Sequence, residues 1–222
     1  MNMLGMDTST AATSACLLRA DGEAFEVVPA AESLGGPPSH ARELMPALAD
    51  VLEQAGLDWS DADAIAVGTG PGTFTGLRIG IATARALAHA HGAALRPVSS
   101  LAALAAGIEA ELRLPVLDAR RGEVFAALYR GDQEVWAPCA APPAELAERL
   151  KAEELTPLAA GDGSVRFRDV LEAGGARVAP EGSVAHVVRA LHVCRLGRAA
   201  PSVAPEAVLP DYLRLPDANP QR

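Results

Sequence analysis

The chain has 222 residues, enough for one large domain or two compact lobes that bury a substantial core. Half of the residues are hydrophobic and 21% are charged, which excludes a disordered or fibrous chain. A net charge of −9 without a basic stripe argues against this chain alone being a main nucleic-acid-binding surface.

Cysteine usage and hydropathy indicate where the protein resides. Cys16, Cys139 and Cys194 are far apart and form no CxxC pattern, so neither a disulfide framework nor a zinc site is expected. The start of the chain lacks the features of a signal peptide. The longest uncharged run, residues 64–77, is too short and too interrupted by glycine and proline to span a bilayer. We expect a reduced, cytoplasmic protein that has no contact with a membrane.

In chain order, the first half predicts an antiparallel strand trio followed by alternating helices and strands. The expected strands are residues 3–7, 15–18, 24–28, 62–67 and 94–98, and the expected helices are residues 39–55, 73–91 and 100–111. Gly56 and Gly92 are placed to end the first two helices.

The second half begins again with a strand, a hairpin and then helices. The expected strands are residues 114–117, 123–129, 134–136 and 155–160, and the expected helices are residues 143–150, 165–172 and 184–196, before a proline-rich, irregular tail. In each half a strand is followed by an aspartate and a strand pair, at Asp7 and at Asp118. This similarity indicates a faint internal duplication.

A glycine-rich stretch, residues 68–80, lies between an expected strand and an expected helix, the context of a phosphate-binding loop. It lacks the Lys-Ser/Thr of a P-loop and the Gly-x-Gly-x-x-Gly spacing of a dinucleotide site, and no acidic residue occurs between residues 68 and 108. A dinucleotide oxidoreductase is therefore excluded. Tight turns and close packing are favoured over phosphate binding, although both interpretations stay open.

The helix at residues 73–91 has a stripe of small residues. Gly76, Gly80, Ala84 and Ala88 recur every four residues, and Arg78 lies among the few charged residues of the helix. Such a stripe lets another backbone approach closely. The partner is either the chain's own helix at residues 39–55 or a second subunit, and the sequence does not decide between them.

Two strand ends carry residues that some two-lobed ATPases use for a metal-bound nucleotide. These residues are Asp7, Thr8 and Ser9 after the first strand and Asp118 in the second half. Ordinary turns explain the same residues equally simply and are favoured. The histidines show no zinc-binding spacing, and no Ser-His-Asp set or G-x-S-x-G motif occurs, which argues against a peptidase.

Five segments together resemble the bacterial TsaB family, also called YeaZ. They are residues 3–9, 39–46, 70–80, 118–125 and 210–214, of which the glycine-rich segment 70–80 is the most specific. The resemblance implies an α/β fold with two lobes of the actin, sugar-kinase and Hsp70 (ASKHA, ribonuclease H-like) type, in which helices flank mixed sheets. We expect an N-terminal lobe at residues 1–100. The smaller C-terminal lobe would cover residues 101–222, with its terminal segment packing back on the first lobe.

The resemblance also implies a role in forming threonylcarbamoyladenosine beside the anticodon of tRNAs that read codons starting with A. In that family the catalyst is the paralogue TsaD, whose metal is held by a His-x-x-x-His pair. The corresponding residues 97–106 contain no histidine here. We therefore expect a non-catalytic scaffold that activates TsaD, with no cofactor of its own and with ATP and magnesium acting at the level of the complex.

Partners follow from the same resemblance. They are TsaD and the ATPase TsaE, with tRNA contacted indirectly and a homodimer as an alternative assembly. The expected partner interface comprises Leu44, Leu48, Gly76, Arg78, Gly80, Ala84 and Ala88. The alternative function is a small ASKHA-type ATPase or kinase that uses Asp7, Thr8, Ser9 and Asp118 for its own nucleotide.

Overall fold

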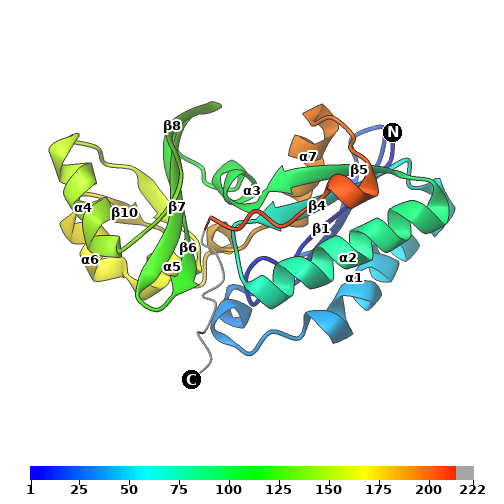
Figure 1. Cartoon of the computed structure of the whole chain (residues 1–222), viewed down its shortest axis with the longest axis horizontal. Coiled ribbons are helices and arrows are strands. Elements are labelled where there is room, and N and C mark those ends of the chain that lie inside the picture. The colour runs from blue at the N-terminus through cyan, green and yellow to red at the C-terminus, as the bar shows by residue number, and fades with distance from the viewer. Residues whose placement is uncertain (214–222) are drawn as a thin grey trace, which may run out of the picture.

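Two five-stranded sheets form the two lobes of the chain (Figure 1). The computed structural model describes residues 1–213. Residues 214–222, the end of the expected second lobe and of the last family segment, lie outside the described part.

The first sheet contains the strands of the N-terminal half in the order β3-β2-β1-β4-β5. The strands are β1 (Met3–Asp7), β2 (Ser14–Leu18), β3 (Ala24–Val27), β4 (Ala64–Gly70) and β5 (Ala94–Ser99). β1 is antiparallel to β2 and parallel to β4. The sheet is therefore mixed, as the sequence predicted.

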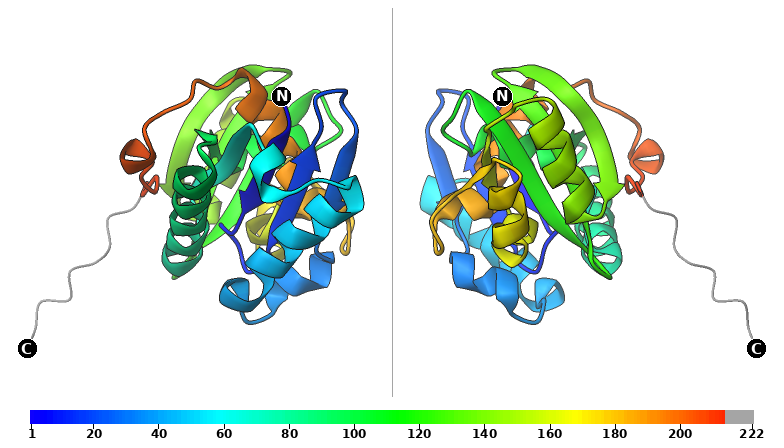
Figure 2. Two further views of the ribbon diagram at one scale, coloured as in Figure 1. Left: turned by 90° about the vertical axis from the view of Figure 1, so that its right-hand side faces the viewer. Right: turned by 90° about the vertical axis from the view of Figure 1, so that its left-hand side faces the viewer.

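Helices cover both faces of the first sheet. α1 (His40–Ala55) and α2 (Phe74–His91) lie side by side on one face, where they bury an aliphatic core (Figure 2). α3 (Ser100–Ala106) and α7 (Ala190–Ala199) contact each other and the other face. Their core also takes in side chains of the second sheet, so one continuous apolar cluster joins the lobes.

The second sheet repeats the connectivity of the first, in the order β8-β7-β6-β9-β10. Its strands are β6 (Leu112–Arg120), β7 (Glu123–Arg130), β8 (Gln133–Ala141), β9 (Leu158–Ala160) and β10 (Arg177–Val178). β6 is antiparallel to β7 and parallel to β9, as β1 is to β2 and β4. The lobe is completed by α4 (Pro143–Ala152), α5 (Asp162–Arg166) and α6 (Arg168–Ala173). The duplication suggested by Asp7 and Asp118 is therefore confirmed.

The last described segment returns to the first lobe. After α7, Val203 forms an antiparallel bridge with Leu95 of β5, and Val208 is buried in the core beneath α1 and α2. The Asp211 N–H then donates to the Thr69 carbonyl at 2.7 Å. This path brings residues 211–213 to the edge of the space between the lobes.

Three predicted helices are wrong in extent, and the one expected at residues 165–172 is divided at Phe167 into α5 and α6. The helix expected to reach residue 111 ends at Ala106, where Gly107 caps it and β6 follows. The helix expected at residues 184–196 divides into a short 3-10 turn, Val184–His186, and α7. Between them the Val188 carbonyl accepts a hydrogen bond from Ser14 Oγ, which ties the chain to β2.

Candidate functional site

The first half of the glycine-rich stretch packs against the turn that follows β1. A Cβ atom on Gly68 would collide with the Asp7 carboxylate, and one on Gly72 would collide with the Ser9 backbone. The Thr73 N–H donates to the Ser9 carbonyl at 2.7 Å in the same contact. Close packing therefore accounts for these glycines, the interpretation that the sequence favoured.

The small-residue stripe of α2 also faces the chain itself. A Cβ atom on Gly76 would collide with the Thr8 carbonyl, and one on Gly80 would collide with Thr8 Oγ1. Ala84 and Ala88 are buried in the core that α2 shares with α1. The expectation that this stripe is open to a second subunit is corrected, because Thr8 and the core shared with α1 already cover it.

The remaining residues of the expected interface are two buried leucines and one exposed arginine. Leu44 and Leu48 are 1% and 0% exposed and belong to the core under α1, so neither is available to a partner. Arg78 is exposed on the outer face of α2. A partner that docks on α1 and α2 would therefore contact their outer face.

Asp7 is the centre of a closed hydrogen-bond network. Its Oδ1 accepts from the backbone N–H and Oγ of Ser9 at 2.8 and 2.6 Å, and its Oδ2 accepts from Ser100 Oγ at 2.7 Å. Burial raises the pKa of Asp7, and the hydrogen bonds from Ser9 and Ser100 oppose that rise. Asp7, Thr8 and Ser9 are each 1% exposed, and none is among the described residues that line the space between the lobes. The structure therefore does not bring these three residues to the nucleotide position that the alternative function requires.

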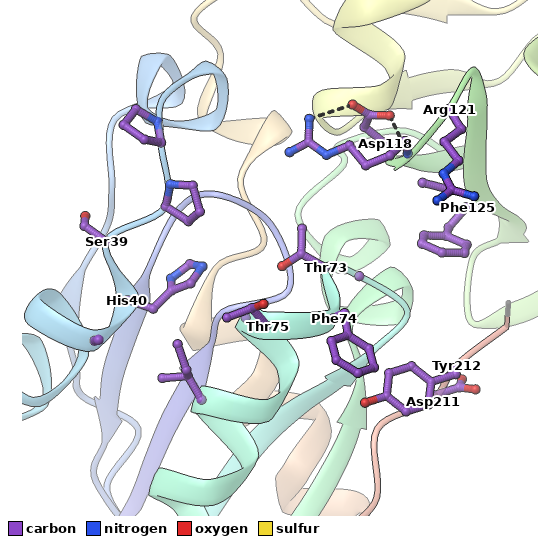
Figure 3. Close-up of a pocket in the computed structure, with 18 of the residues that line it drawn as sticks. Ser39, His40, Thr73, Phe74, Thr75, Asp118, Arg121, Phe125, Asp211 and Tyr212 are labelled. Carbon is purple, nitrogen blue, oxygen red and sulfur yellow. Dashed lines mark hydrogen bonds and ion pairs between the residues drawn. The ribbon is translucent and has the colours of Figure 1, made fainter. Parts of the chain in front are cut away.

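A cleft of about 870 Å³ separates the two lobes (Figure 3). Its walls come from the starts of α1 and α2, the turn between β6 and β7, and the returning terminal segment. They comprise Pro37–Arg42, Gly72–Gly76, Ile79, Asp118–Arg121, Phe125, Asp211 and Tyr212. The cleft is thus built from segments far apart in the sequence.

Asp118 is the one residue of the expected nucleotide set that reaches this cleft, and its carboxylate is already paired. Oδ2 lies 3.2 Å from a guanidinium nitrogen of Arg120 and 2.8 Å from one of Arg166. Its backbone N–H donates at 2.9 Å to Asp162 Oδ1. Burial raises the pKa of Asp162 to about 6, helped by the nearby Asp118 charge and opposed by the hydrogen bonds from the Asp118 and Gly163 N–H groups.

An aromatic and cationic cluster stands beside the cleft, and we name it the α2 cluster: Phe74, Arg78 and Tyr212. The Arg78 guanidinium lies 3.6 Å from the centre of the Phe74 ring, and Arg78 Nε donates to the Tyr212 hydroxyl at 3.0 Å. The Phe74 and Tyr212 rings stack with their centres 5.5 Å apart. Phe74 and Tyr212 are not among the site residues predicted from the sequence, although an aromatic residue at an exposed helix start was a usable signal for Phe74.

The chain is similar to known proteins both in sequence and in structure. Residues 36–194 match the family described as TsaD: tRNA N6-adenosine threonylcarbamoyltransferase. A solved structure described as YeaZ from Pseudomonas aeruginosa is 30% identical, with a TM-score of 0.77 over 95% of this chain and 99% of that chain. The chain belongs to the TsaB (YeaZ) family.

Two further structures extend this comparison. A Pseudomonas aeruginosa protein described as uncharacterised and similar to peptidase YeaZ is 30% identical, with a TM-score of 0.78 over 96% of this chain and 99% of that chain. The ethanolamine utilization protein EutJ from Carboxydothermus hydrogenoformans has a TM-score of 0.51 at 13% identity over 87% of this chain and 89% of its own, which shows likeness of fold alone. No curated protein matches significantly.

Membership of the TsaB family fixes the fold and the broad process. The fold is of the two-lobed ASKHA type, with mixed sheets flanked by helices, and the family acts in tRNA modification.

Within residues 1–213, no group of three or more His, Cys, Asp or Glu side chains is arranged to hold a metal. In the same part of the chain, no helix combines the length and apolar character needed to cross a membrane.

Residues 97–106, where the resemblance led us to look for a metal-binding histidine pair, cover the end of β5 and all of α3. There Ser99 Oγ caps α3 by accepting from the Ala102 N–H at 3.3 Å. The next hydroxyl, on Ser100, is committed to Asp7 and accepts from the Gly70 N–H at 3.2 Å. The Ser99 hydroxyl therefore caps α3, and the Ser100 hydroxyl joins the start of α3 to β1 and β4.

Proposed function

We propose that this chain is a non-catalytic subunit that binds TsaD and supports transfer of the threonylcarbamoyl group to the adenosine beside the anticodon. The substrates would be tRNAs that read codons starting with A, contacted through the complex. TsaE would complete the assembly, and ATP and magnesium would act within it, in the cytoplasm. Family membership and the exposed α2 cluster support this proposal.

The α2 cluster is the observation on which the proposed docking face depends. Phe74 is 42% exposed, although it is a large apolar side chain at the start of a helix. Its contacts with Arg78 and Tyr212 hold all three side chains in place before a partner arrives. Fixed aromatic and arginine side chains lose little conformational entropy on binding, and such residues dominate interface energies.

Charge favours a partner with an acidic surface. α2 contains no acidic residue. Its basic side chains include Arg78 and His89, which are exposed, and Arg85, which is half-buried. This contrasts with the net charge of −9 of the whole chain. Complementary charges steer association and fix the orientation of the partners. The proposed surface of TsaD therefore presents carboxylates to this helix.

This chain would support TsaD by binding the active form of TsaD more tightly than the inactive form. A subunit that binds the active form of its partner more tightly than the inactive form shifts the population toward the active form. The alternative, an ATPase or kinase centred on Asp7 and Asp118, would require both carboxylates to leave the hydrogen bonds and ion pairs described above. We therefore favour the scaffold.

Reconstitution tests the proposal. TsaD, TsaE, ATP, magnesium, an activated threonylcarbamoyl donor and a substrate tRNA would be assayed for threonylcarbamoyl transfer with this chain present and with it omitted. The proposal predicts transfer only when the chain is present, and neither transfer nor ATP hydrolysis by the chain alone. Transfer at the same rate without the chain would contradict it, and ATP turnover by the isolated chain would favour the alternative.

A further inference from the structure

The end of the described chain contacts three different parts of the structure in succession. The Asp211 N–H donates at 2.7 Å to the carbonyl of Thr69, near the end of β4. The next residue, Tyr212, stacks on Phe74 of α2. Leu213 then packs against the apolar cluster that joins the lobes. Three consecutive residues therefore link the first sheet, α2 and the core between the lobes.

The apolar cluster that Leu213 joins contains side chains of both sheets. Met3 of β1 and Ala66 of β4 come from the first sheet, and Leu117 of β6 and Phe125 of β7 come from the second. Phe125 also lines the cleft, on the wall that belongs to the second lobe (Figure 3). The described chain therefore ends where the two lobes meet.

Apart from this segment, two chain connections join the lobes within residues 1–213. The chain passes to the second lobe between α3 and β6, and it returns between the turn at Val184–His186 and α7. Lobes that are joined by a pair of connections can move as a hinge, and each further contact between them restricts that movement. Residues 211–213 supply such a contact without a covalent link to the second lobe.

The segment is anchored upstream and then held by contacts that are easily broken. Val208 is 1% exposed in the core beneath α1 and α2, whereas the next residue, Leu209, is 67% exposed. Tyr212 is held by its stacking on Phe74, with the ring centres 5.5 Å apart, and by the hydrogen bond of 3.0 Å from Arg78 Nε. One stacked ring pair and one hydrogen bond at a surface are modest enough for a single substitution to release them.

We propose that residues 211–213 form a clasp that limits the opening of the interlobe cleft, closed by the contacts of Tyr212 with Phe74 and Arg78. When Tyr212 leaves these contacts, Leu213 loses its place between the lobes, and the lobes separate more freely. The α2 cluster and the width of the cleft are therefore coupled. A partner on the α2 cluster would keep the clasp closed. That consequence alone rests on the proposed function, whereas the clasp itself belongs to the isolated chain.

The test measures the distance between the lobes in the isolated, full-length chain by double electron–electron resonance. Spin labels would be attached at Gln54→Cys on α1 and Glu148→Cys on α4, two exposed positions in different lobes. Cys139→Ser would remove the partly exposed native thiol, and Cys16 and Cys194 are buried out of reach of the label. A closed clasp predicts one narrow distance distribution for the chain with its native residues 211–213.

Two variants open the clasp from opposite sides. Tyr212→Ala removes the stacked ring and the hydroxyl, and it should raise the population of longer distances by about tenfold. Phe74→Ala, at a position that is 42% exposed, spares the buried core and should also raise that population. The double variant should open little further than Tyr212→Ala, because both changes break the same contact.

Leu209→Ala is the matched control, because it changes an exposed side chain of the same segment upstream of the clasp. This variant should keep the narrow distribution. A narrow distribution in either Tyr212→Ala or Phe74→Ala would overturn the proposal, and so would equal broadening by Leu209→Ala. Since no partner is present in these measurements, failure of the clasp is distinguishable from failure of the chain to bind TsaD.

Discussion

Replacing Gly80 with alanine tests how closely α2 packs on the turn after β1. The new methyl group would overlap Thr8 Oγ1 and lie 3.6 Å from Thr8 Cβ. Thr8 is 1% exposed, and its hydroxyl donates to the Gly76 carbonyl at 2.8 Å. The methyl group must therefore break that hydrogen bond or displace the helix from β1.

The expected change in the free energy of unfolding is the balance of one favourable and two unfavourable effects of the methyl group. In a helix interior, alanine is more favourable than glycine by about 1 kcal/mol. Overpacking a tight core costs about 1–3 kcal/mol, and a lost buried hydrogen bond adds about 1 kcal/mol. We expect Gly80→Ala to lower the free energy of unfolding by about 1–3 kcal/mol. For a chain of 222 residues, each kcal/mol corresponds to about 2–4 °C in Tm.

Urea unfolding followed by circular dichroism measures this change. The double variant Thr8→Ala/Gly80→Ala should lose less stability than the sum of its single changes, because the colliding hydroxyl is gone. Ala86→Gly, at an exposed position of the same helix, is the control and should cost about 1 kcal/mol through helix propensity alone. A stabilised Gly80→Ala variant, or strictly additive single changes, would refute the intramolecular packing of the stripe.

Two further predictions concern buried charge. The pKa of Asp162, raised to about 6, means that the folded chain holds this proton more tightly than the unfolded chain, so this group's contribution to stability falls by about 2 kcal/mol as pH rises from 4 to 7. Asp162→Asn should therefore gain stability relative to the wild type over that range in urea titrations, and a constant difference would contradict the assignment. Glu26 is paired with Arg189 at the junction of β3 and α7. Glu26→Ala should lower the free energy of unfolding by about 3 kcal/mol, which a fall in Tm would measure. Glu23→Ala, which breaks an exposed pair with Arg19, should cost under about 1 kcal/mol, and equal losses would argue against the buried pair.

The first lobe was largely predictable because its signals are local. α1 and α2 begin within one residue of the predicted positions and end as predicted. Gly56 and Gly92 adopt the left-handed conformation, with φ of 65° and 68°, that ends a helix. Amphipathic spacing and end signals of this kind are contained within a few consecutive residues.

The partner of the glycine stripe was not predictable from the same helix. The spacing of Gly76 and Gly80 shows that some backbone comes close, but Thr8, which occupies that space, precedes Gly76 by 68 residues. Contacts with such separation depend on strand order, which the local pattern does not encode. For the same reason the neighbourhood of Phe74 and Tyr212 was missed.

The second lobe was less predictable because tertiary contacts set its boundaries. Propensity favoured one helix across residues 184–196, whereas the hydrogen bond from Ser14 to the Val188 carbonyl holds residues 187–189 extended. The short strand β10 has only two residues and depends on pairing with β9. The Asp118 network likewise requires Arg166, which lies 48 residues later.

The affinity of this chain for TsaD, measured by isothermal titration calorimetry with both proteins purified separately, tests the central proposal most directly. We predict a saturable complex that Arg78→Glu weakens by at least about tenfold, since the change removes a docking side chain and adds a like charge. Arg130→Glu, an exposed arginine on the second lobe, is the matched control and should bind as the wild type does. Absence of binding by the folded wild-type chain, or equal affinities for the two variants, would contradict the proposed docking face.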